Sequence, residues 1–250
     1  MNPWPWRIVI ALSLAALGGC ASNRTGPAVL PDHEVAMLNL KLGMGYMQSG
    51  RFDIAQEKLK KALQLDGTIA EAHNALGVLY EEIHEPRLAE SAYQQALAQN
   101  SNYSLARMNY GRLLCAIGKT AEGEQQFVTA LQSTDTSPET AYTGAGVCAR
   151  LRNDSAQAAT YFRKAVEANP YATAPLLELA NLSYAQRQYQ EARQYLQRYH
   201  QQTDYSPASL DLAIRIEQAL GDKQARDNYV RLLLSKFADS SEAQRLAKSK

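Results

Sequence analysis

Small and bulky apolar residues recur along this chain at a fixed spacing of 34 positions. Glycines stand at Gly43, Gly77 and Gly111, and a second small residue follows each of them twelve positions later. In each unit a bulky apolar residue then lies three positions before a third small one, at Leu59 and Ala62, Tyr93 and Ala96, and Phe127 and Ala130. Because two helices approach closely only where small residues meet, this pattern predicts repeated pairs of antiparallel helices.

The spacing slips by one residue after the third unit and then continues to the sixth. The turn inside each predicted pair falls at Gly50, His84, Gly118, Asn153, Arg187 and Gly221. Three of these residues are glycine and one is asparagine, which tolerate the left-handed backbone at a helix end. The predicted units cover about 36–69, 70–103, 104–137, 139–172, 173–206 and 207–240.

This 34-residue spacing of small residues resembles the tetratricopeptide repeat (TPR). The resemblance covers 36–240 and implies an all-α solenoid of six helix–turn–helix units, wound as a right-handed superhelix with a concave face. The alternative is an unrelated helical bundle with alanine-rich interfaces. The sixth unit loses several small residues, which is typical of a terminal cap.

The N-terminal stretch predicts export rather than folding. Arg7 precedes an apolar run, residues 8–17, that is shorter than the ~20 residues needed to span a bilayer. Such a run fits the apolar region of a secretory signal peptide. The domain boundaries that follow are a signal peptide over 1–19, a short linker over 20–35, the solenoid over 36–240 and a C-terminal tail over 241–250.

The run ends in Leu17-Gly18-Gly19-Cys20, which resembles the bacterial lipobox. That resemblance implies cleavage before Cys20 and acylation of its sulfur and amine, with palmitate among the acyl chains. Ala21 follows, in place of the aspartate that retains many such lipoproteins at the inner membrane, and this implies an anchor on the periplasmic face of the outer membrane. An ordinary signal peptide with an incidental Cys20 is the alternative.

The balanced charge and the lack of known catalytic motifs argue against several classes of function. The chain has 26 Lys and Arg against 25 Asp and Glu and no basic block, so we expect no nucleic-acid partner. Its four histidines are scattered, and no zinc, phosphate-loop or nucleophile-elbow motif occurs. We therefore expect no enzyme activity, no cofactor, no metal and no small-molecule substrate, but a protein-binding surface.

Two cysteines remain beyond Cys20. On the repeat spacing, Cys115 and Cys148 occupy nearly the same height on the first helices of the third and fourth units. Equivalent helices of adjacent units lie side by side, and disulfides persist in exported chains, so we predict a Cys115–Cys148 disulfide. Two separate buried thiols are the alternative.

In the repeat family, positions 2, 5, 9, 12 and 13 of a unit usually line the concave face. The resemblance therefore implies a partner-binding groove formed by Met37, Leu40, Met44, Met47, Asn74, Val78, Met108 and Arg112. Three methionines in the first unit favour contact with another helix or peptide, and we expect the main docking site there. The alternative is that segment 21–34 folds back over this apolar stripe.

Three stretches of the sequence narrow the range of families to which this chain could belong. They are "ARMNYGRLLCAIGK" (106–119), "GAGVCA" (144–149) and "LLELANLSYAQRQYQEARQYLQRY" (176–199). Together they resemble the type IV pilus biogenesis and stability lipoproteins, the PilF/PilW family. The resemblance implies a pilotin that binds the pilus secretin subunit, promotes its outer-membrane localisation and multimerisation, and supports twitching motility. A scaffold of outer-membrane protein assembly and a regulator of periplasmic cell-wall enzymes stay open as alternatives.

Overall fold

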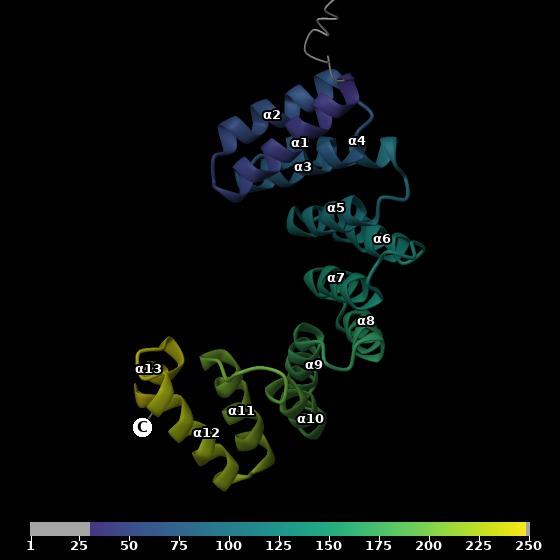
Figure 1. Cartoon of the computed structure of the whole chain (residues 1–250). Coiled ribbons are helices and arrows are strands. Elements are labelled where there is room, and N and C mark those ends of the chain that lie inside the picture. The colour runs from purple at the N-terminus through teal and green to yellow at the C-terminus, as the bar shows by residue number, and fades with distance from the viewer. Residues whose placement is uncertain (1–30, 249–250) are drawn as a thin grey trace, which may run out of the picture. The chain divides into compact units, whose positions relative to one another are not determined.

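Helices follow one another in antiparallel pairs throughout the computed structural model, which describes residues 31–248 (Figure 1). The predicted signal peptide and Cys20 lie outside the described residues. The described residues from Asp32 to Lys248 form one compact unit. Within residues 31–248 the structure contains thirteen helices and no strand: α1 (Asp32–Gln48), α2 (Phe52–Leu65), α3 (Ala70–Glu82), α4 (Pro86–Gln99), α5 (Ser104–Ala116), α6 (Thr120–Ala130), α7 (Pro138–Leu151), α8 (Ser155–Ala168), α9 (Thr173–Ala185), α10 (Tyr189–His200), α11 (Pro207–Leu220), α12 (Lys223–Lys236) and α13 (Ser241–Lys248).

The odd-numbered helices form one continuous surface, which we call the first-helix face. Each first helix packs against the second helix of its own unit, and each second helix also packs against the first helix of the next. First helices of neighbouring units touch directly at α1–α3, α3–α5, α5–α7, α9–α11 and α11–α13. The stacking therefore displays the odd-numbered helices together along one side of the unit.

The predicted turns are confirmed at all six positions. Gly50, Gly118 and Gly221 have φ of 71°, 86° and 77°. His84, Asn153 and Arg187 take the same left-handed conformation in spite of their side chains, with φ of 61°, 65° and 61°. A left-handed residue ends a helix sharply and lets the chain reverse, so the two helices of a unit run antiparallel.

Glycines and bulky side chains fit together across each helix pair. A methyl group added at Gly77 would lie 2.5 Å from the Tyr93 ring, and one added at Gly146 would lie 2.6 Å from the Phe162 ring. Both rings are in the buried core. The period seen in the sequence is therefore a packing period, because only a residue without a side chain leaves room for the ring at this distance.

Both ends of the helical part differ from the predicted boundaries. Helix α1 begins at Asp32, inside the predicted linker, and the segment predicted as a tail forms α13. Ile214 stands where the first four units have glycine and the fifth has Ala180. It is buried in one cluster with Leu233 and Ala243, and Leu246 packs against that cluster. Helix α13 thus covers the apolar end of the sixth unit, which a bare tail would have left in water.

One histidine is enclosed near this end of the molecule. The His200 ring lies 4.4 Å from Tyr205 and 5.5 Å from Tyr199, measured between ring centroids. Burial lowers the pKa of His200 to about 4, because the imidazolium would lose its hydration. The side chain is therefore neutral at neutral pH and acts as a packing residue.

The glycine packing predicts opposite effects for two alanine substitutions. At Gly123 an added methyl group would lie 2.6 Å from the Gly111 carbonyl oxygen and against the Cys115 sulfur, while at Gly45 it would meet no atom within 4 Å. We expect Gly123→Ala to lower the free energy of unfolding by about 1–3 kcal/mol. Gly45→Ala should raise it by about 0.5–1 kcal/mol, since alanine favours an exposed helix.

Urea unfolding of the two variants beside the unchanged protein measures both effects under the same conditions. If Gly123→Ala were as stable as Gly45→Ala, the close approach of α5 and α6 would not depend on the missing side chain.

Candidate functional site

The first-helix face begins with the methionines of α1. Met44 exposes 47% of its surface, whereas Met37 and Met47 are half-buried and pack against the core cluster of the first units. These three side chains lie on one helix, and they form an apolar surface that we call the α1 methionine surface. It remains a predicted docking surface.

Two residues of the predicted groove belong to the interior instead. Leu40 is only 4% exposed and lies in the same core cluster as Ala36 and Leu59. It follows Ala36 by four positions, so it shares the face of α1 that packs against its neighbours. The prediction that Leu40 contacts a partner is therefore wrong.

Asn74 is the second correction, since it is 7% exposed. Its Oδ1 atom accepts a hydrogen bond of 3.1 Å from the Asn109 side-chain amide, which joins α3 to α5. A buried amide that is already paired stabilises the stacking of two units and is not available to a partner. Val78, another predicted groove residue, is half-buried against the same core.

Arg112 projects from the first-helix face and is held in place from the neighbouring unit. Its guanidinium donates two hydrogen bonds to the Glu81 carboxylate, of 3.0 and 2.9 Å. Tyr93 also donates to Glu81, at 2.5 Å. Burial and this carboxylate together raise the pKa of the Tyr93 hydroxyl. The network fixes the orientation of Arg112 between α3 and α5.

A groove of about 570 Å³ lies between α5 and α7 on this face, and we call it the α5–α7 groove. Its lining includes two predicted residues, Met108 and Arg112, and brings in others that the prediction did not name. These further lining residues include Phe127, Glu139, Thr143, Val147 and Leu151. The repeat positions predicted the main docking site in the first unit, because three methionines fall at those positions there. The groove instead arises where two neighbouring units leave space between their first helices.

The disulfide lies in the wall of this groove. Cys115 and Cys148 are bonded, both line the α5–α7 groove, and their Cα atoms are 5.4 Å apart. Both residues are buried. The bond links the first helices of the third and fourth units directly, so it sets the separation of α5 and α7 at the groove.

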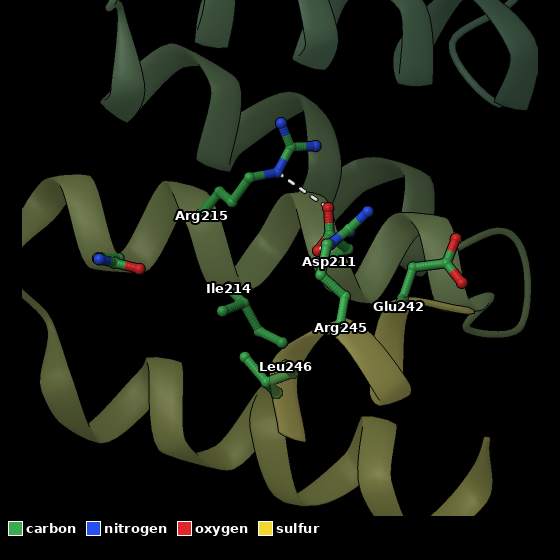
Figure 2. Close-up of a pocket in the computed structure, with 7 residues that line it drawn as sticks. Asp211, Ile214, Arg215, Glu242, Arg245 and Leu246 are labelled. Atoms are coloured by element: carbon green, nitrogen blue, oxygen red, sulfur yellow. Dashed lines mark hydrogen bonds and ion pairs between the residues drawn. The ribbon is translucent and has the colours of Figure 1, made fainter. Parts of the chain in front are cut away.

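A second hollow, of about 470 Å³, lies between α11 and α13 and is charged (Figure 2). Asp211 forms an ion pair with Arg215 at 3.0 Å and accepts a hydrogen bond from Arg245 at 2.7 Å. Figure 2 shows Ile214 and Leu246 close below this cluster. The contact between Asp211 and Arg245 attaches α13 to α11, so the charged groups of this hollow help to hold α13 in place.

The described residues offer neither a metal centre nor a membrane span. In residues 31–248, no three side chains of the metal-binding types lie together. Within the same range, no helix combines the length and hydropathy that a bilayer-spanning segment requires. The predicted lipid attachment at Cys20 lies outside this range and stays a prediction.

Comparison with known proteins decides the family. The tetratricopeptide-repeat models match residues 34–101 and, in three overlapping matches, 79–138, 116–173 and 152–207. The type IV pilus assembly protein PilF of Pseudomonas aeruginosa is 31% identical over 226 residues, covering 88% of this chain and 89% of that protein. This chain belongs to the PilF family of tetratricopeptide-repeat proteins.

Solved structures agree with this assignment. The structure of P. aeruginosa PilF aligns with a TM-score of 0.75 and 32% identity, over 88% of this chain and 99% of that one. The crystal structure of PilW, a type IV pilus biogenesis factor, aligns with a TM-score of 0.76 and 25% identity, over 86% and 99%. The fold is thus an all-α TPR superhelix, and the relatives that share it over most of this chain are proteins of type IV pilus assembly and biogenesis.

The disulfide leads to a direct chemical prediction. Reduction of the purified, unfolded protein should add the mass of two hydrogens, and reduction before unfolding should lower stability by about 3–4 kcal/mol, since the bond closes a separation of 33 residues. The double variant Cys115→Ala/Cys148→Ala should show no response to reductant. Alkylation of both thiols in unfolded but unreduced protein would contradict the bond.

Proposed function

We propose that this chain is a pilotin, a lipoprotein that escorts subunits of the type IV pilus secretin to the outer membrane and promotes their assembly into the multimeric pore. The observation that carries the proposal is the extent of the likeness to PilF, which covers 88% of this chain and 89% of that protein. At most 12% of this chain lies outside that match, so most of the units whose first helices form the first-helix face take part in the comparison.

In the proposed mechanism, the client is carried to the membrane by the lipid anchor of this chain. The first-helix face holds a segment of the client without any bond being made or broken in it. Acyl chains on Cys20 supply the membrane address, at ~0.8 kcal/mol for each buried methylene group. Residues 21–31, even fully extended, reach at most about 40 Å, so the face works close to the outer membrane.

The test of this function is the state of the secretin in cells that lack the gene. Membranes are fractionated, and heat-resistant secretin multimers are detected by blotting. The proposal expects multimers to disappear from the outer membrane while monomers remain. Persistent multimers together with disturbed porins or a disturbed cell wall would indicate an outer-membrane assembly scaffold or a cell-wall regulator instead.

The α1 methionine surface has its own matched test. Met44 on α1 and Leu88 on α4 are each 47% exposed, but only Met44 belongs to the first-helix face. We expect Met44→Glu to reduce secretin multimers several-fold in complemented cells, because a charge would replace an apolar contact. Leu88→Glu should complement fully. If both variants complemented equally at equal protein levels, the methionines of α1 would not be part of the docking site.

A further inference from the structure

His200 stands at a position where every other unit has an aliphatic residue. It is the last residue of α10, the second helix of the fifth unit. On the repeat spacing, the equivalent residues of the other five units are Leu63, Leu97, Leu131, Val166 and Leu234. All five are buried or half-buried, so this position serves the packing between helices. In the fifth unit a titratable ring therefore replaces an aliphatic contact.

The His200 ring packs among tyrosines from both sides of the junction between the fifth and sixth units. Tyr205, in the connection after α10, and Tyr229, on α12, have ring centroids 4.4 and 6.4 Å from that of His200. The Nε2 atom is buried and has no hydrogen-bond partner among residues 31–248. An imidazolium carries a proton on both nitrogens and needs hydration that burial of this atom prevents. The packing therefore favours the neutral ring.

The connection after α10 lacks a hydrogen bond that fixes three of the other connections between units. In those three, an Asp or Asn side chain accepts from the backbone amide two residues further on: Asp66 from Thr68, Asn100 from Asn102 and Asn169 from Tyr171. The equivalent residue of the fifth unit is Thr203, whose side chain cannot take the place of the Asx oxygen in the same geometry. The sixth unit therefore depends more on the aromatic cluster around His200 for its attachment to the fifth.

His200 is the group of this cluster whose charge changes between pH 5 and pH 7.5. The titratable and charged groups on the elements around it are three tyrosines, one ion pair and one exposed acid: Tyr199, Tyr205, Tyr229, Arg193 with Glu217, and Asp204. Tyrosine hydroxyls ordinarily lose their proton only near pH 10, and the arginine and glutamate neutralise each other. No ion pair joins an acid to His200 within the described residues, so an imidazolium there would be uncompensated.

We infer that the junction between the fifth and sixth units is an acid-sensitive joint, in which protonation of His200 drives its ring out of the tyrosine cluster and frees α11 and α12 from α10. Burial holds the pKa of His200 at about 4 in the folded chain, below its ordinary value of 6.5. As the pH falls below about 6.5, the opened state takes up the proton first, and the stability of the joint is lost progressively down to about pH 4. The joint is independent of the client that the protein holds.

Urea unfolding at pH 7.5 and pH 5.0 measures this linkage in the purified chain 21–250, whose described part forms a compact unit. His200→Leu restores the aliphatic residue of the other units. Relative to this variant, the unfolding equilibrium constant of the unchanged protein should rise roughly tenfold or more between pH 7.5 and pH 5.0. His200→Gln, which is polar but does not titrate, should lose this dependence as well. His84→Asn removes an exposed histidine and should retain it.

Hydrogen exchange locates the opening along the chain. After correction for the intrinsic pH dependence of exchange, the amides of α11 and α12 should lose about tenfold of their protection at pH 5.0, because the joint opens before the rest of the solenoid unfolds. The amides of α3 and α4 should keep their protection. In His200→Leu, α11 and α12 should keep theirs too. Circular dichroism at pH 7.5 confirms that each variant is folded.

Two results would overturn the joint. If the unchanged protein and both His200 variants showed the same dependence on pH, or if His84→Asn abolished it, His200 would not be the group that responds to acid. If α3 and α11 lost protection equally at pH 5.0, acid would loosen the whole solenoid rather than this junction.

Discussion

The contact on which this protein depends is that of a glycine on a first helix with a bulky side chain on its second helix. Gly77 lies against Tyr93 and Gly146 against Phe162, at distances that leave no room for even one methyl group. The first four units repeat this contact, since Gly43 lies against Leu59 and Gly111 against Phe127, and the first helices of the stacked units come to lie together on one side. The binding surface is thus a consequence of how the interior packs.

A second set of interactions joins neighbouring first helices and makes their face rigid. Helices α3 and α5 are joined by the Asn74–Asn109 hydrogen bond and by the Glu81–Arg112 ion pair, α5 and α7 by the disulfide, and α7 and α9 by the Arg150–Glu178 ion pair. A surface held in this way loses little conformational entropy when it binds a partner. These links engage polar groups of the middle units, and the α5–α7 groove between them is lined largely by apolar side chains.

The fold could be predicted from the sequence because its determinants are local and repeated. The spacing of small residues and the six turn positions are visible without any tertiary information, and all six turns have the left-handed backbone in the structure. The cysteine pair followed from the same spacing combined with the expected compartment, and the structure contains that bond. The cap α13 was missed because its eight residues carry no repeat spacing of their own.

The binding residues were harder to predict because exposure depends on neighbours from other units. Leu40 and Asn74 occupy positions that line the concave face in related repeats, yet here both are buried by α1–α3 and α3–α5 packing. The α5–α7 groove was not predicted as a whole, since its shape depends on residues from two units and on Phe127 from a second helix. Leu151, at the end of one helix, gave a signal only through its four-residue spacing from Val147.

The central claim is that the first-helix face is where this PilF-family protein holds its client. The most direct measurement is photo-crosslinking in piliated cells, with a photoreactive amino acid placed in turn at positions 44, 151 and 88 of the full chain. The account predicts that positions 44 and 151 capture the secretin subunit and that position 88, on a second helix, does not. Capture from position 88 with none from 44 or 151 would place the working surface on the opposite side and contradict the account.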